Sequence, residues 1–197
     1  MKKTILLFSL LFFSGTIAAQ DYDDQEEYDT KTTGGHVHEI GFDGHFSASN
    51  FGGSGGLGVK YGYVLNENFI IGPSLRFQRS WYNNYGLKNA ATIYGGGVWV
   101  HARFYNYFFI GAEFEMLNTP FDQVTYSGKR TWAPTLFAAA GFSREFGAGL
   151  RLNAGVYYDV INHGNSPFRT GYFLRNSKGV YIPLIYRIGL FIPIGRK

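Results

Sequence analysis

The chain has 197 residues, of which 45% are hydrophobic, 19% aromatic and only 16% charged, with 27 glycines and no cysteine. The absence of cysteine excludes a disulfide scaffold, a thiol enzyme and a metal site with cysteine ligands. The aromatic content excludes an intrinsically disordered chain, and the net charge of +4 is too small and too scattered to indicate binding to nucleic acid.

The N-terminal segment, 1–19, is typical of a secretory signal peptide. Lys2 and Lys3 precede an apolar stretch, 5–17, which the small residues Ala18 and Ala19 follow. This stretch is shorter than the roughly 20 residues that a helix needs to cross a bilayer. We therefore expect cleavage after Ala19 and export from the cytoplasm.

The next segment, 20–35, carries six acidic side chains between Asp21 and Asp29 and almost nothing to bury. We expect a disordered, solvated tail. Its acidic side chains could also bind a divalent cation or a basic protein partner. The remaining segment, 36–197, is basic, with 15 Lys and Arg against 8 Asp and Glu.

The segment 36–197 has a hydrophobic period of two. From Phe69 to Phe77 apolar side chains alternate with small or polar ones, and the same pattern recurs from Phe108 and from Leu150. Such alternation indicates β-strands with one apolar face and one polar or mixed face. Eight strands are predicted, at 37–49, 56–65, 69–81, 90–105, 108–117, 132–144, 149–161 and 180–192.

The predicted connections alternate in length. Three are tight, at 66–68, 106 and 145–148, and four are longer, at 50–55, 82–89, 118–131 and 162–179. An even number of antiparallel strands, with tight turns at one end and longer loops at the other, is the plan of a transmembrane β-barrel. The sequence therefore predicts an all-β fold, an eight-stranded antiparallel up-and-down transmembrane barrel over 36–197.

The charged residues of these strands lie on the face opposite the apolar one. If the apolar face contacts lipid, the charges line a polar lumen, where they can form ion pairs. In a soluble barrel the same charges would be buried in an apolar core, at a cost of several kcal/mol for each unpaired charge. The predicted lumen charge network, which we expect to plug the barrel, consists of Glu39, Asp43, Lys60, Arg76, Arg103, Glu113, Glu115, Arg151, Asp159 and Arg187.

On this architecture, and on the segments NENFIIGPSLRF (66–77), NYFFIGAEFEML (106–117) and YRIGLFIPIG (186–195), the chain resembles the small eight-stranded outer-membrane barrels of Gram-negative bacteria. The OmpX type and the transmembrane domain of OmpA are familiar members. The resemblance implies an outer-membrane location, with periplasmic termini and extracellular long loops. Many such barrels end on an aromatic residue, whereas here Phe191 is followed by six further residues.

Pro73 is a test of the strand assignment, since it falls within the predicted strand 69–81. Proline has no backbone N–H to donate to a ladder, and a closed barrel has no free edge to accommodate it. We therefore expect a bulge or a missing ladder bond at Pro73.

Two glycine-rich motifs suggest phosphate loops. The segment GSGGLG (53–58) matches the GxGxxG pattern. In a dinucleotide site this motif opens a helix, whereas here it opens a predicted strand. We interpret it as a flexible loop. Gly95, Gly96 and Gly97 lie within a predicted strand, where glycine more often relieves crowding. No cofactor is expected.

His36 and His38 are weak candidates for a metal site, because they lie two residues apart beside Glu39 and the acidic tail. Two histidines do not define a site. Asp43, His45 and Ser47 supply an acid, a base and a nucleophile on one face. Their spacing of about 7 Å along a strand is too wide for a catalytic triad, so no catalytic residue is assigned and no enzyme is expected.

Two classes of function follow. The first is a structural or interaction protein, or an accessory subunit, that contacts outer-membrane lipid and lipopolysaccharide, or a protein partner through the acidic tail or the long loops. The alternative is a small pore or transporter; a lipid-modifying enzyme or protease is a distant third. The candidate contact residues in the last loop are Phe168, Arg169, Tyr172, Phe173, Arg175 and Lys178.

Overall fold

The computed structural model describes residues 38–49, 52–66, 68–84, 87–104, 107–120, 129–146 and 149–195. The expected signal peptide, the acidic tail and His36 lie outside these residues. Among the described residues, no helix has the length and apolar character needed to cross a membrane.

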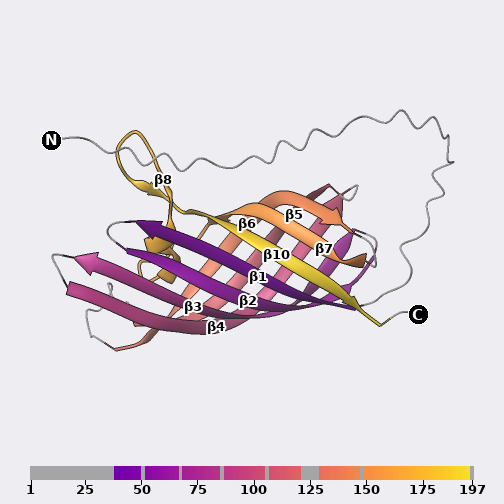
Figure 1. Ribbon diagram of the computed structural model, residues 1–197, viewed down its shortest axis with the longest axis horizontal. Helices are drawn as coiled ribbons and strands as arrows, with labels where there is room; N and C mark the ends of the chain where they lie inside the picture. Colours follow the sequence, from indigo (N-terminus) through magenta and orange to yellow (C-terminus); the bar gives the residue numbers. More distant parts are fainter. Residues whose placement is uncertain are drawn as a thin grey trace. The chain divides into compact units, whose positions relative to one another are not determined.

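Eight strands form a closed antiparallel barrel in which each strand pairs with its neighbours along the chain and β1 pairs with β10 (Figure 1). The predicted eight-stranded up-and-down barrel is therefore confirmed. The barrel strands are β1 (His38–Ser49), β2 (Gly52–Val64), β3 (Phe69–Asn84), β4 (Leu87–Phe104), β5 (Phe108–Thr119), β6 (Thr131–Glu145), β7 (Arg151–Asp159) and β10 (Leu184–Ile194).

The connection between β7 and β10 contains the remaining elements. A short 3-10 helix, η2 (Pro167–Gly171), is followed by a two-stranded hairpin of β8 (Leu174–Arg175) and β9 (Tyr181–Ile182). We call the segment 173–182 the outer hairpin. Its turn is closed by Asn176, whose Oδ1 accepts hydrogen bonds of 3.0 Å from the amides of Lys178 and Val180.

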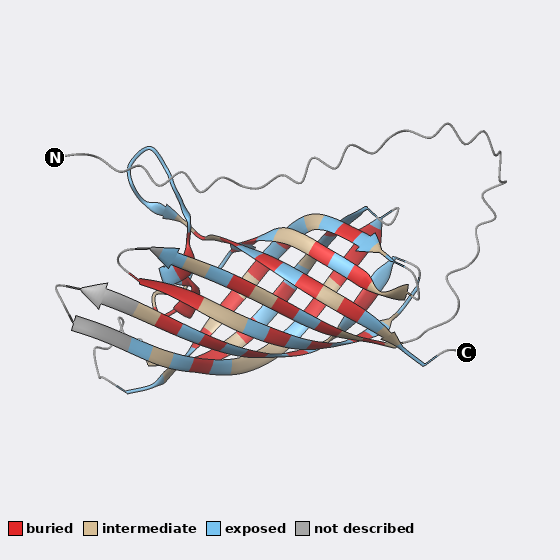
Figure 2. Ribbon diagram, in the orientation of Figure 1, coloured by how far each residue is buried: buried red, intermediate tan, exposed pale blue. Residues whose placement is uncertain are grey.

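Burial alternates residue by residue along the strands, which gives the barrel wall a chequered pattern (Figure 2). In β3 the side chains of Ser74, Arg76, Gln78 and Ser80 are buried, whereas Pro73, Leu75 and Phe77 between and beside them are exposed. The predicted assignment of the two faces is thus confirmed. Successive side chains of a β-strand point to opposite faces of the sheet, so the assignment of each residue to a face follows from the local pattern alone.

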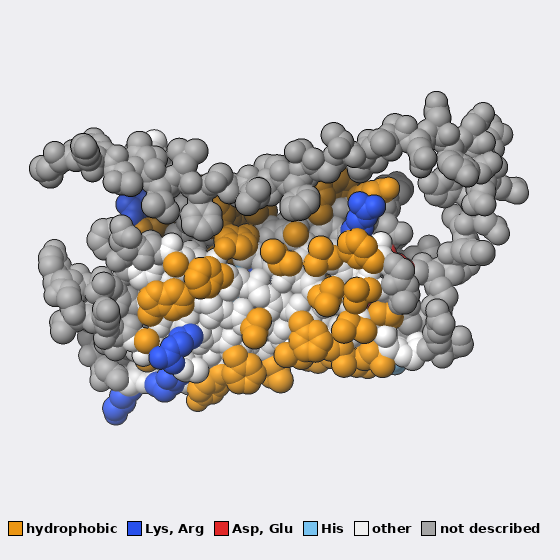
Figure 3. All heavy atoms as spheres, viewed as in Figure 1, with side chains coloured by type: hydrophobic (Ala, Val, Ile, Leu, Met, Phe, Trp, Pro, Cys, Tyr) orange, Lys and Arg blue, Asp and Glu red, His pale blue; other side chains and the backbone are white. Residues whose placement is uncertain are grey.

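The outer surface of the barrel is apolar. Large hydrophobic side chains cover the wall in Figure 3, and most of the exposed ones belong to barrel strands. Phe77, Leu75 and Phe142 are all more than half exposed, at 59%, 58% and 67%. An exposed apolar wall around a charged interior is the polarity of a transmembrane barrel, the reverse of a soluble one.

The prediction of four long loops is wrong for the first two. Only residues 50 and 51 separate β1 from β2, and only 85 and 86 separate β3 from β4. Gly53 and Gly55, expected in the connection 50–55, lie in β2. A side chain at Gly53 would collide with the Ser47 carbonyl and the Trp81 ring. The sequence signal failed because the residues at 50–56 and 82–89 include many Gly and Asn and do not alternate between apolar and polar.

Pro73 interrupts one ladder, as expected. The β2–β3 register runs from Gly52↔Tyr82 to Lys60↔Ser74 and resumes at Tyr63↔Ile71, so the two pairs between are missing. The register before and after the gap is the same, which excludes a bulge. The pairing of β3 with β4 continues through Pro73↔Val98.

Candidate functional site

The candidate site is the interior of the barrel. All ten charged residues predicted to line the lumen are buried, although they fall into three groups instead of one network. The central group contains three carboxylates and three cations, and its formal charges cancel. Its members come from β1, β2, β3, β5 and β10: Asp43, Lys60, Arg76, Glu113, Glu115 and Arg187.

Lys60 joins two carboxylates at the middle of the central group. Its Nζ lies 2.7 Å from Oδ2 of Asp43 and also pairs with Oε1 of Glu113. The second oxygen of Glu113 lies 2.7 Å from Nη1 of Arg187, and Oε1 contacts Nε2 of His101 at 2.9 Å. Glu113 therefore touches three nitrogen-bearing side chains from three other strands.

Arg76 closes the other side of the central group. Its Nε donates to both oxygens of Glu115, at 2.8 and 2.9 Å. Its Nη2 lies 3.1 Å from Oδ1 of Asp43. Arg187 completes the circuit, with Nη2 3.6 Å from Oε2 of Glu115. Charge-assisted pairs of this kind compensate for the desolvation of buried charges, since each ion has counter-ions within contact distance.

Aromatic side chains fill the lumen around these charges. The guanidinium carbon of Arg187 lies 4.5 Å from the ring centroid of Phe137 and 4.8 Å from that of Tyr157. Lys60 Nζ lies 5.4 Å from the Trp99 ring. All three aromatic residues are buried. Cations over aromatic faces gain further stabilisation where water is excluded.

A second group lies toward the end of the barrel that carries the tight turns. Arg103 forms a bidentate pair with Glu39, with N–O distances of 2.8 and 2.7 Å. Arg151 pairs with Glu145 and donates to Ser143 Oγ at 3.3 Å. The sequence did not identify Glu145, because its place beside a glycine-containing turn suggested a connection and not a lumen position.

Asp159 forms the third group, at the opposite end, where it holds the last loop. Its Oδ2 accepts hydrogen bonds from the hydroxyls of Ser166 (3.2 Å) and Tyr172 (3.1 Å), and its Oδ1 accepts from the amide of Asn162 (3.0 Å). Burial, followed by the nearby charge of Asp159, raises the pKa of Tyr172 above its usual value. The hydroxyl therefore stays protonated and donates to the carboxylate.

The segment 162–172, which we call the mouth plug, turns into this end of the barrel. Phe168 on η2 is fully buried, with its ring centroid 4.9 Å from Phe137 and 5.3 Å from His45. Gln78 on β3 donates to the Pro167 carbonyl at 3.1 Å. The plug thus rests directly on the central group, since Arg187 lies 5.2 Å from the Phe168 ring.

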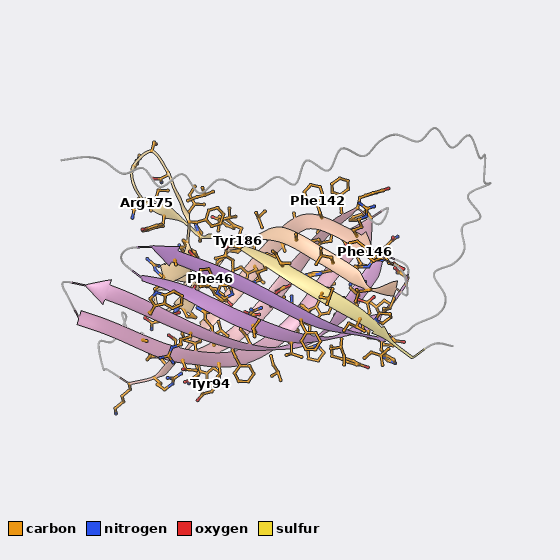
Figure 4. All side chains as sticks on the ribbon, viewed as in Figure 1. Phe46, Tyr94, Phe142, Phe146, Arg175 and Tyr186 are labelled. Atoms are coloured by element: carbon orange, nitrogen blue, oxygen red, sulfur yellow. The ribbon has the colours of Figure 1, made fainter. Side chains whose placement is uncertain are left out.

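These positions correct the expected contact surface of the last loop. Phe168 and Tyr172 are buried, at 0% and 6% exposure, so they hold the loop and do not present a surface. The other candidates are exposed: Arg169, Phe173, Arg175 and Lys178. Arg175 stands out on the outer hairpin (Figure 4), with its guanidinium 4.1 Å from the Tyr181 ring.

The remaining candidate residues do not assemble into a chemical site. Asp43 is engaged by Lys60 and Arg76, and His45 approaches Ser54 at 3.4 Å and not Ser47. His38 Nδ1 lies 2.7 Å from the Tyr61 hydroxyl. Within the described ranges, no group of three or more metal-ligating side chains is found.

Comparison with known proteins gives a structural likeness. No family model matches the chain, and no curated protein matches it. Among solved structures, the chain is similar to the outer membrane protein Ail of Yersinia pestis, determined in a phospholipid bilayer nanodisc. The TM-score is 0.44 and the identity 11%, over 80% of this chain and 99% of that chain.

Proposed function

We propose that the protein is a non-enzymatic integral barrel of a bacterial outer membrane, acting as a structural or interaction protein or as an accessory subunit, with a lumen closed to solutes. The observation that supports the proposal is the interior, in which a charge-balanced cluster of ion pairs and the loop residues Phe168 and Tyr172 are buried. The long loops face the outside, and both termini face the periplasm.

The membrane location is supported by the distribution of polarity. Exposed Phe, Leu, Ile and Val side chains surround the wall, whereas the buried residues include twelve Lys, Arg, His, Asp and Glu side chains. A soluble fold has no reason to arrange residues in this way, because exposed apolar patches of this extent promote association. In a bilayer the same wall is solvated by acyl chains.

The closed lumen is supported at two levels. An eight-stranded barrel has an interior just wide enough for side chains to fill it, and here Lys60, Arg76 and Arg187 are held across it by carboxylates from other strands. Above them, Phe168 and Tyr172 of the mouth plug are buried. A solute would have to displace both layers.

Planar-bilayer conductance tests the proposal. The mature wild-type chain should give no stable channels. As a control, a variant in which 163–172 is replaced by a short Gly-Ser turn removes the upper layer but leaves the central group intact, and it should also fail to conduct stably. Large, long-lived channels in the wild type would refute the closed lumen.

The alternative is a small pore, and one observation favours it. Eleven buried side-chain atoms make no hydrogen bond to a described residue, among them both amide atoms of Asn153 and Nε and Nη2 of Arg187. Buried polar atoms of this kind are generally satisfied by internal water, and a hydrated lumen can leak ions. Short, small openings that resist mutation of the mouth plug would support this alternative.

The interaction role is tested by co-purification. The native protein and a version lacking 21–35 are extracted from membranes under the same conditions. A stoichiometric partner that is lost with the acidic tail supports an accessory subunit. A partner retained by both versions indicates that the contact is made by the outer loops and not by the acidic tail.

A further inference from the structure

The first and last strands of the barrel pair over only part of their length. The β1–β10 ladder ends at Gly44↔Ile188, although β1 continues past Gly44 and four residues of β10 precede Ile188. On their other sides these same residues stay paired, with β2 and with β7. Two strand edges, 45–48 and 184–187, therefore face each other without pairing between described residues. We call this part of the wall, where β1 and β10 run side by side in Figure 1, the open seam.

A tyrosine side chain spans the open seam. The hydroxyl of Tyr186 on β10 donates a hydrogen bond to the backbone carbonyl of Phe46 on β1. Extending the register beyond Gly44↔Ile188 places these two residues opposite each other, and Figure 4 labels both on this part of the wall. A tyrosine hydroxyl lies at the far end of a long side chain, so it reaches the backbone opposite only where the two strands stand apart.

The open seam lies at the depth of the outer leaflet. Six residues separate His38, at the turn end of β1, from Gly44, which corresponds to about 20 Å along a strand. At the usual barrel tilt of about 40°, the ladder therefore ends about 15 Å up an apolar band that is roughly 25 Å tall. Backbone groups without partners are costly in the hydrocarbon region. An unpaired edge at this depth marks a place where the wall can part.

Behind the open seam, two buried side chains carry nitrogens that make no hydrogen bond to a described residue. They are His45 on β1 and Arg187 on β10, which the extended register places opposite each other. Both pack against Phe168, whose ring centroid lies 5.3 Å from that of His45 and 5.2 Å from the guanidinium carbon of Arg187. Their exposures are 7% and 1%, so bulk water does not satisfy them.

The unpartnered atoms are a pair of donors and an acceptor. Nη1 of Arg187 donates to Glu113, whereas Nε and Nη2 make no hydrogen bond, since Glu115 Oε2 lies 3.6 Å from Nη2. These two nitrogens share one edge of the guanidinium, which suits a carboxyl group. Nε2 of His45 lies 3.4 Å from Ser54 Oγ. With the hydrogen on Nε2, Nδ1 is an acceptor.

We infer that the open seam admits the carboxyl group of a long-chain fatty acid from the outer leaflet. Its carbonyl oxygen accepts from the Nε–Nη2 edge of Arg187, and its O–H donates to Nδ1 of His45. The acyl chain leaves between Phe46 and Tyr186 and stays among the lipid chains. The inference goes beyond the proposed function and rests on its membrane location. The lumen stays closed to water-soluble solutes, because the ligand does not pass the mouth plug.

Binding is tested on the mature chain refolded into phosphatidylcholine nanodiscs and titrated with palmitic acid. Bound ligand is counted by native mass spectrometry. H45F keeps a ring against Phe168 but removes the acceptor, and R187K keeps the charge but removes the two-nitrogen edge. Each should bind about tenfold more weakly than the wild type, the loss expected for one hydrogen bond to a buried group. R79Q, an exposed position on β3, is the matched control and should bind as the wild type does.

The route is tested by closing the open seam. The chain has no cysteine, so the two thiols of A48C/L184C can be joined across the seam by a short bifunctional thiol reagent without side reactions. The crosslinked barrel should take up palmitic acid at least about tenfold more slowly than the same variant before crosslinking, since the carboxyl group can no longer pass between the strands.

Four results would overturn the inference: no binding by the wild type, equal binding of methyl palmitate or hexadecanol, equal binding by H45F, or equal uptake after crosslinking. Should R187K not fold, H45F decides alone. A barrel that inserts into the nanodisc and ignores palmitic acid contradicts this inference only. A chain that does not insert contradicts the proposed function as well.

Discussion

The indole Nε1 of Trp99 on β4 donates a hydrogen bond of 3.2 Å to the backbone carbonyl of Tyr61 on β2. In the β2–β3 register Tyr61 falls opposite Pro73, at the gap in the ladder. Proline offers no N–H to that carbonyl, so a side chain from a third strand supplies the missing donor. The same Nε1 lies 3.2 Å from the Pro73 carbonyl.

This relationship predicts that Trp99 and Pro73 are energetically coupled. Trp99→Phe removes the donor and should lower the free energy of unfolding by about 1–3 kcal/mol, the range for an orphaned buried acceptor. In a Pro73→Ala background, the new amide of residue 73 can donate to Tyr61, so the same change should cost less. Urea unfolding of the four proteins in lipid vesicles gives the coupling energy. Strictly additive effects would contradict it.

Arg76 and Arg79 lie three residues apart on β3 and face opposite ways. Arg76→Gln leaves Glu115 and Asp43 short of a counter-ion in the lumen, which should destabilise the barrel by about 3–5 kcal/mol. Arg79→Gln, on the outer wall, is the matched control and should unfold at nearly the wild-type urea concentration. Similar losses in both variants would mean that the central group does not stabilise the fold.

Phe168 and Phe173 provide a matched pair in the last loop. Phe168→Ala empties a buried site beneath η2 and should cost about 3 kcal/mol locally. The amides of Ser166 and Arg169, which donate within the mouth plug at 2.8 and 3.3 Å, should then exchange their hydrogens over a hundredfold faster. Phe173→Ala, at a position 45% exposed, should leave that exchange unchanged. Protection that survives Phe168→Ala would show that the phenyl ring does not hold the plug.

Tyr172 predicts a dependence of stability on alkaline pH. Because burial and the adjacent Asp159 carboxylate raise its pKa in the folded state, the folded protein holds this proton more tightly than the unfolded chain. The associated stability is present below the unfolded pKa of about 10 and is lost as pH rises above it. Between about pH 10 and 12, the free energy of unfolding should therefore fall more steeply for the wild type than for Tyr172→Phe. Parallel curves would contradict this assignment.

The sequence predicted most of the fold because the decisive signal is local. Period-two alternation assigns each residue to a face without knowledge of its neighbours in space, so the inward position of Arg76 and the outward position of Phe77 could be read directly. The lengths of the loops near residues 50 and 85 differ from the prediction because the alternating pattern is missing there. There the strands continue as paired hairpins, but the residues at 50–56 and 82–89 include many Gly and Asn and do not alternate between apolar and polar in sequence.

The sequence by itself thus determined the class of fold, the polarity of the two faces and the identity of the buried charges. Only the tertiary structure decided which charges meet, because barrel closure brings together residues far apart in the chain. Arg103 pairs with Glu39 across 64 positions, and Arg187 with Glu113 across 74. The tertiary structure also showed that Phe168 and Tyr172, which were candidates for a contact surface, are buried in the mouth plug. Whether an aromatic loop residue faces water or fills a barrel mouth depends on the cavity available to it, which no local pattern encodes.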